Sequence, residues 1–155
     1  DLNIDDYEIL GVEKEVRFKV GDYDMIGYID LLLKNKETGE ITILDHKSAS
    51  IKILKNGKIS KSDSAHFEEF KHQLYLYSKA VIEEYGRVDY LEWNLFKDQN
   101  NYCIPWKDEE YSEAINWAID TIHKIENETE WAPNPDFYYC RYLCGQRTYG
   151  CPYKP

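Results

Sequence analysis

The sequence predicts an α/β fold in which a central mixed sheet opens with an antiparallel three-strand meander and is flanked by helices. Two turn signals, Gly21-Asp22 and Asn35–Glu40, divide the chain up to Lys47 into three strand-like segments. Two later segments carry apolar residues at steps of three and four, which is helical spacing. Strands combined with long amphipathic helices are typical of this fold class.

The predicted meander consists of the strands Tyr7–Val20, Met25–Leu33 and Ile41–Lys47. The first strand ends at Gly21-Asp22, and a turn containing Thr38-Gly39 separates the second from the third. Because short turns join antiparallel neighbours, we expect these strands to pair in sequence order.

The second half is predicted as a helix, a hairpin of two strands and a second helix: Ser64–Glu84, Val88–Phe96 with Tyr102–Pro105, and Asp108–Asn127. Gly86 closes the first helix, and Lys97–Asn101 is the turn of the hairpin. Acidic residues begin the second helix, where the helix dipole favours them, and its apolar side should pack on the sheet.

Length and composition indicate one domain over residues 1–155, with a core at 1–130 and a cysteine- and aromatic-rich tail at 131–155. The 155 residues are 43% hydrophobic, enough for a substantial core. No signal segment or apolar run of about 20 residues is present, so we expect a soluble, cytoplasmic protein without membrane contact. The chain lacks an initiator Met, so we expect either a processed chain or part of a longer protein, from which upstream elements are missing.

The net charge of −10 argues against broad, non-specific binding of nucleic acid. One segment differs, because residues 47–61 contain no acidic residue. Its lysines after Lys47 are Lys52, Lys55, Lys58 and Lys61. They form either a local nucleic-acid-binding surface or a solvated loop.

Asp30, Asp45 and Lys47 are the residues that point to chemistry. Asp45 and Lys47 are two apart on a strand and therefore project from one face. Carboxylates can hold a hard divalent cation, and a lysine can stabilise an attacking hydroxide or the charge that develops on a phosphate. Alternatively, both aspartates only end strands or cap turns.

Gln73 and Tyr77 are four residues apart on the first predicted helix and share a face with His66 and Phe70. With Gly-x-x-Asp ending at Asp30, then Asp-x-Lys, then Gln-x-x-x-Tyr, the segment Val16–Val81 resembles the RecB-like branch of the PD-(D/E)XK nuclease superfamily. The resemblance implies a restriction-endonuclease-like core and metal-dependent hydrolysis of DNA, as an exonuclease or end-processing enzyme.

The resemblance also implies roles for individual residues. Asp30, Asp45 and the backbone carbonyl of His46 would hold Mg²⁺ or Mn²⁺, Lys47 would be the catalytic lysine, and Gln73 with Tyr77 would support it. The family usually supplies a further acidic or histidine residue from an upstream helix, for which this sequence has no room, and Glu15 is our candidate replacement. DNA is the expected partner, with an unidentified recombination or helicase protein as a second.

Four cysteines form a separate pattern. Cys140, Cys144 and Cys151 lie close together in the tail, and Cys103 lies far upstream. Relatives in the RecB-like branch hold an iron–sulfur cluster with three C-terminal cysteines and one that precedes the core. The two gaps between the C-terminal cysteines are each one residue longer here than in those relatives. An iron–sulfur cluster, a zinc ion and reduced thiols all remain open. The surrounding tail aromatics either stack unpaired bases or cover a sheet.

Two other function classes compete with the nuclease. The fold could serve as a catalytically weak nucleic-acid-binding module, which the missing upstream helix favours. An acidic domain that mimics DNA is a third reading, based on charge and aromatic content, and Asp45 beside Lys47 argues against it.

Overall fold

The computed structural model describes residues 3–153, with the backbone alone at residues 147 and 148. The chain divides into two compact units, residues 1–121 and residues 122–155. The first unit contains the whole sheet and, with it, Asp30, Asp45 and Lys47. The single domain predicted over residues 1–155 stays a prediction.

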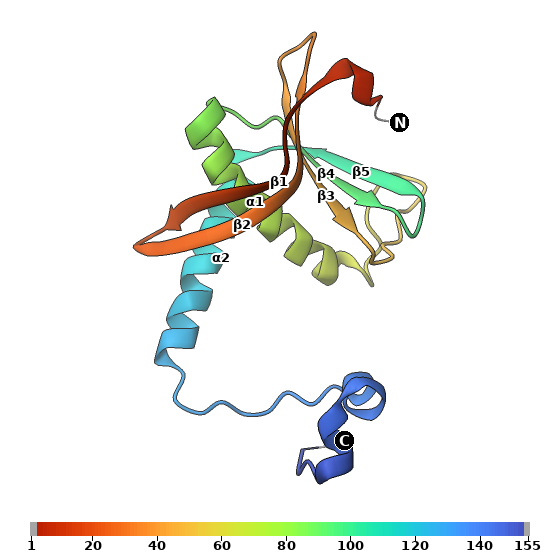
Figure 1. Cartoon of the computed structure of the whole chain (residues 1–155), viewed down its shortest axis with the longest axis vertical. Helices are drawn as coiled ribbons and strands as arrows, with labels where there is room; N and C mark the ends of the chain where they lie inside the picture. The colour runs from red at the N-terminus through yellow and green to blue at the C-terminus, as the bar shows by residue number, and fades with distance from the viewer. Residues whose placement is uncertain (1–2, 154–155) are drawn as a thin grey trace. The chain divides into compact units, whose positions relative to one another are not determined.

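Five strands form one sheet in the order β1-β2-β3-β4-β5 (Figure 1). Their bounds are β1 Tyr7–Val20, β2 Tyr23–Asn35, β3 Ile41–Lys47, β4 Tyr90–Leu95 and β5 Asn100–Pro105. The first three pair antiparallel in sequence order, β3 and β4 are parallel, and β4 and β5 form an antiparallel hairpin. The predicted mixed sheet with its opening meander is therefore confirmed.

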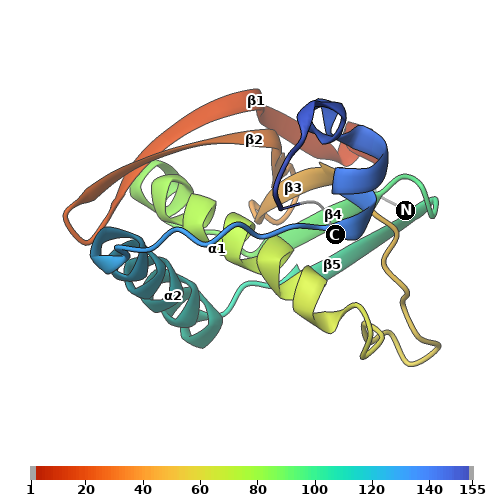
Figure 2. The ribbon, with the colours of Figure 1, turned by 90° about the horizontal axis from the view of Figure 1, so that it is seen from below.

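Helix α1, Ser64–Tyr85, provides the crossover between the parallel strands β3 and β4. A parallel pair needs a connection of this length, since a tight turn can only reverse the chain. The helix crosses one face of the sheet (Figure 2) and buries Phe67, Leu74 and Val81 against Ile43 and Trp93. It ends at Gly86, which adopts φ of 84°, a conformation that glycine adopts without steric cost.

Helix α2, Asp108–Asn127, begins in the first unit and crosses into the second. Its first turns lie beside α1, where Lys71 forms an ion pair with Glu110. Ala114 and Ala118 are buried in the core cluster of the sheet. Since α1 contributes to the same cluster, both helices cover the same face.

The structure corrects several predicted boundaries. Strand β2 is longer at both ends than the predicted Met25–Leu33, β4 is shorter than Val88–Phe96, and β5 begins two residues before Tyr102. The tail, predicted as irregular, contains two short helical segments: Tyr139–Leu143 and Gly145–Tyr149. One further turn of 3-10 helix, Ile4–Asp6, precedes β1. Within residues 3–153, none of the helices has the length and apolar character that crossing a membrane requires.

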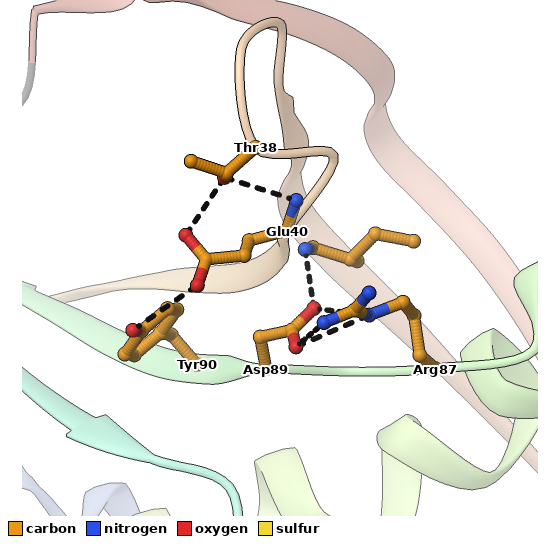
Figure 3. Close-up of polar contacts among 6 residues, drawn as sticks. Thr38, Glu40, Arg87, Asp89 and Tyr90 are labelled. Carbon is orange, nitrogen blue, oxygen red and sulfur yellow. Dashed lines mark hydrogen bonds and ion pairs between the residues drawn. The ribbon is translucent and has the colours of Figure 1, made fainter.

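A polar cluster holds the start of β3 against the start of β4 (Figure 3). Asp89 accepts a hydrogen bond of 2.8 Å from the backbone N–H of Ile41 and pairs with the guanidinium of Arg87. Glu40 accepts a hydrogen bond of 2.8 Å from Thr38 and one of 3.5 Å from Tyr90. These contacts set the register of β3, whose opposite end carries Asp45 and Lys47.

Candidate active site

Asp30 and Asp45 lie opposite each other on β2 and β3. Leu32 pairs with Ile43 and Leu31 with Leu44, and the next register step brings the two aspartates together. The backbone N–H of His46 donates a hydrogen bond of 2.7 Å to Asp30 Oδ2. The structure therefore unites three of the predicted site positions at one point of the sheet, on the face that α1 covers.

The regular alternation of side chains is broken near Asp30, where this residue faces Asp45. Glu13, the position opposite Asp30 in the β1–β2 register, has φ of 47°, which is strained for a residue with a Cβ. Ile29 and Leu32 both belong to the core cluster, although regular alternation would send them to opposite faces. The local distortion lets both residues face the core while Asp30 turns to Asp45.

Asp45 is a buried carboxylate that pairs with Lys47. It is 4% exposed, and its Oδ2 lies 2.8 Å from Lys47 Nζ as an ion pair. Apart from Lys47, no donor of the described residues reaches this oxygen. Burial raises the pKa of Asp45; Lys47 opposes the shift and the charge of Asp30 adds to it. A buried carboxylate that lies beside a second carboxylate and contacts a cation suits a site that holds positive charge.

Lys47 is held from three sides. Besides Asp45, its Nζ donates a hydrogen bond of 2.8 Å to Gln73 Oε1 and lies 4.9 Å from the ring centroid of Phe70. Gln73 Nε2 in turn donates to the hydroxyl of Tyr77 at 3.3 Å. The chain Asp45–Lys47–Gln73–Tyr77 thus links the sheet to α1, as the spacing of the helix residues predicts. Phe70 was expected on this face, but its contact with the lysine was not.

Gly27 explains how Tyr77 reaches this position. The phenol ring packs directly on the backbone of β2 at Gly27, where an added Cβ would lie 2.2 Å from Tyr77 Cε1. Such a distance is far inside van der Waals contact, so only glycine fits without movement. The first residue of the Gly-x-x-Asp motif therefore serves packing, and its last residue, Asp30, lies beside Asp45.

Glu15 does not join the aspartates. Its side chain is exposed, pairs with Arg17 at 2.8 Å and accepts a hydrogen bond of 3.1 Å from Tyr28. Among residues 3–153, no group of three His, Cys, Asp or Glu side chains could hold a metal ion. Two carboxylates and a backbone carbonyl still suit Mg²⁺, which commonly takes one or two protein carboxylates and completes its shell with water and substrate phosphate. The oxygen donors present therefore fit a hard cation of this kind.

The lysine segment forms a pinned loop. Lys52, Lys55, Lys58 and Lys61 are all exposed. Asp98 fixes the start of the loop by accepting hydrogen bonds from Ser50 Oγ at 2.6 Å and Ile51 N at 3.0 Å. Asp63 joins its two ends by accepting from Lys52 N at 2.9 Å and Ser60 Oγ at 2.8 Å. The loop thus presents its ammonium groups from a defined backbone.

The cysteines are free thiols. Cys103 belongs to the first unit, and Cys140, Cys144 and Cys151 belong to the second. Within the second unit, Tyr139–Leu143 places Tyr138 and Tyr142 with ring centroids 5.2 Å apart, and Arg141 lies over Phe137. Cluster and zinc binding by the four cysteines stay predictions.

One known protein family accounts for nearly the whole chain. The model of the PD-(D/E)XK nuclease superfamily matches residues 3–155. The chain belongs to this superfamily. Its five-stranded mixed sheet, flanked by helices, is the restriction-endonuclease-like fold that the sequence predicts, and nuclease chemistry is the activity of the group.

Individual proteins resemble the chain only distantly. Among curated proteins, none matches the chain significantly. A crystal structure from Eubacterium rectale, of a protein named as a candidate exonuclease, is similar with a TM-score of 0.41 at 10% sequence identity. The match covers 86% of this chain and 57% of that one, so this chain spans little more than half of its length.

Proposed function

We propose that this protein is a divalent-metal-dependent deoxyribonuclease of the RecB-like branch, which degrades or processes DNA from its ends. The buried carboxylate of Asp45, flanked by Asp30 and Lys47, supports this proposal most strongly. An aspartate that only ended a strand would lie in solvent, where its charge is hydrated. The site instead presents oxygen donors for Mg²⁺ or Mn²⁺ beside a fixed positive charge.

Each residue then has a defined task. Asp30 and Asp45, with the carbonyl of His46, would hold the cation, which supplies an activated water and polarises the scissile phosphodiester. Lys47 stabilises negative charge at the reacting phosphate. Gln73 fixes the direction of the lysine through its 2.8 Å hydrogen bond, and Tyr77 fixes Gln73. Gln73 and Tyr77 thus act by positioning Lys47, and no covalent intermediate is required.

Substrate binding needs positive charge that the chain as a whole lacks. The exposed lysines of the pinned loop follow β3 directly, five residues or more after Lys47. We propose that they contact the phosphates of the DNA strand that enters the site. Asp63 and Asp98 limit the motion of the loop, which lowers the entropy lost on binding.

The decisive experiment compares the protein with Asp45→Asn. End-labelled single- and double-stranded DNA is incubated with each in Mn²⁺ or in EDTA. We expect metal-dependent degradation that falls on the order of 10³-fold in Asp45→Asn, while far-UV circular dichroism is unchanged. Asp120→Asn, an exposed site on α2, is the matched control and should retain activity.

Thermal unfolding provides a readout that does not depend on turnover. At a cation concentration of about 100 times its dissociation constant, Mn²⁺ should stabilise the protein by about 2.7 kcal/mol and Asp45→Asn by much less. Equal stabilisation of both proteins would remove Asp45 from the metal site.

A binding module is the second candidate, and the position of Glu15 favours it. Because Glu15 pairs with Arg17 and Tyr28, the described site holds only two acidic side chains. A protein that binds DNA equally with and without Mn²⁺, and that never cleaves it, would favour this candidate over the nuclease.

A further inference from the structure

An open cavity of about 320 Å³ lies directly beside the predicted catalytic residues. Its walls come from the β1–β2 hairpin, α1 and Trp117 in the middle of α2. Phe18, Met25, Ile26 and Leu76 contribute apolar side chains to the lining. Its size is at the lower end of the range for small-molecule sites and suits a single planar ring system.

A stacked aromatic pair forms one side of the cavity. The rings of His72 and Trp117 lie with centroids 4.3 Å apart and an interplanar angle of 24°. Trp117 is 44% exposed, a high value for a large apolar side chain. One face of the indole rests on the imidazole, so its orientation is fixed while much of its surface stays open.

The same helix face serves the cavity and the active site. Glu69, His72, Gln73, Leu76 and Tyr77 line the cavity and follow one another at helical spacing on α1. Gln73 also accepts the hydrogen bond from Lys47. A molecule in the cavity would therefore lie one side chain away from the predicted catalytic lysine.

The charge of the lining selects the kind of occupant. Glu69 is the acidic residue among the described residues of the lining, which contain no lysine or arginine. Burial lowers the pKa of His72, so the imidazole is neutral near pH 7, and its Nδ1 has no hydrogen-bond partner among the described residues. A phosphate would be repelled, whereas an uncharged aromatic heterocycle can stack on the indole.

We propose that this cavity receives one unpaired nucleobase of the substrate strand, stacked on Trp117, next to the phosphate that reacts at Lys47. The proposal rests on the proposed nuclease function and adds that the bound DNA is single-stranded or frayed at this nucleotide. Stacking is insensitive to net charge and to base identity. It therefore gives a chain of net charge −10 a way to hold DNA that does not depend on a basic surface.

The test removes the base and the indole separately and then together. Single-stranded oligonucleotides carry one abasic residue, moved along the strand from member to member, and binding is measured in EDTA, where the nuclease should not turn over. In the unaltered protein, we expect one abasic position to weaken binding by roughly 5- to 100-fold, the range for base–aromatic stacking. Trp117→Ala should weaken binding of the intact strand to a similar degree and lose its sensitivity to that position.

Two controls accompany the measurement. Trp117→Phe keeps an aromatic face and should retain most of the affinity. Alanine is the best helix former, and Trp117 is partly exposed, so Trp117→Ala should fold, which circular dichroism verifies.

The outcomes separate this inference from the proposed function. If the protein degrades DNA in Mn²⁺ but Trp117→Ala keeps the full response to the abasic series, the cavity is not a base site and the inference is overturned. The same holds if no abasic position affects the unaltered protein. Absence of degradation in Mn²⁺, together with a lost abasic response in Trp117→Ala, would overturn the nuclease and keep the base site.

Discussion

Gly27 connects the packing of α1 on β2 to the position of the predicted catalytic lysine. Its missing side chain leaves room for Tyr77, which aligns Gln73 and through it Lys47. We predict that Gly27→Ala moves the tyrosine ring and lowers the rate of DNA cleavage by about 10²-fold, because small displacements of positioning groups have effects of this size. Overpacking should also lower the free energy of unfolding by about 1–3 kcal/mol, measured by urea denaturation.

Gly145→Ala is the matched control for Gly27→Ala, since a Cβ at Gly145 meets no atom within 4 Å. It should change neither property. A Gly27→Ala protein with normal turnover would show that Tyr77 can move without consequence for Lys47.

Glu92 carries the second residue-scale prediction. This residue of β4 is 6% exposed and accepts a hydrogen bond of 2.8 Å from Asn101. Burial raises the pKa of Glu92, and the Asn101 hydrogen bond opposes the shift. A carboxyl whose folded-state pKa is raised stabilises the fold below its unfolded-state pKa, and this contribution is lost as the pH rises through the folded-state pKa.

Glu92→Gln should therefore raise the free energy of unfolding near pH 8 and have little effect near pH 3.5, where the carboxyl is protonated in both states. Each unit of difference between the folded-state and unfolded-state pKa of Glu92 corresponds to about 1.4 kcal/mol in the free energy of unfolding. Urea denaturation at a series of pH values measures the difference, with Glu109→Gln at an exposed position of α2 as the control. A variant that is less stable than the parent at pH 8 would contradict the sign.

At the scale of elements, the position of β3 depends on its anchor to β4. Asp89 accepts from the backbone N–H of the buried Ile41 and pairs with Arg87. We predict that Asp89→Ala lowers the free energy of unfolding by about 1–3 kcal/mol, because a buried N–H is left without an acceptor.

Arg87→Ala provides the comparison for Asp89→Ala in the same urea denaturation experiment. It removes only the partner that lies in solvent and should cost about 0–1 kcal/mol. Equal losses in the two variants would mean that the ion pair, rather than the strand anchor, carries the energy.

For the whole molecule, the distribution of charge matters more than the total. The net charge is −10, and DNA affinity must come from a restricted basic surface and from stacking. We predict that changing the loop lysines Lys52, Lys55, Lys58 and Lys61 to Gln makes the dependence of log K on log salt shallower by up to about 3, since each phosphate contact to a single strand contributes about 0.7. Fluorescence anisotropy of a labelled oligonucleotide over a salt series measures this slope.

A variant with the same change of net charge elsewhere tests whether position matters. The exposed lysines for this control are Lys19, Lys34, Lys36 and Lys124. A slope that falls equally in both variants would assign the effect to total charge and remove the loop from the DNA interface.

Much of the fold was accessible from local patterns. Turns at Gly21-Asp22 and Thr38-Gly39 delimit the meander, and Gly86 ends α1 where the apolar repeat stops. Boundaries of β2, β4 and β5 were displaced by a few residues, because strand ends depend on the length of the partner strand rather than on the strand itself. The two short helical segments of the tail have no periodic signal long enough to predict.

The candidate site also contains residues that the sequence predicts and residues that it does not. The order and spacing of Asp30, Asp45, Lys47 and Gln73 predict a common location, and the contacts of the first unit unite them. Glu15 was assigned by position along the strand, but Arg17 and Tyr28 occupy its carboxylate. Trp117 lies off the buried stripe of α2, formed by Ala114 and Ala118, and a large aromatic residue at such a margin is the signal that could have indicated the cavity.

By itself, the sequence determined the types and order of the elements and the identity of the chemical groups, since these depend on local periodicity and on the residues themselves. Only the tertiary structure decided that Asp45 is buried against Lys47, that Tyr77 rests on Gly27, and that Trp117 and Gln73 border one cavity. Burial, register and cavities arise from contacts between residues far apart in the chain, and no local pattern encodes the distances between them.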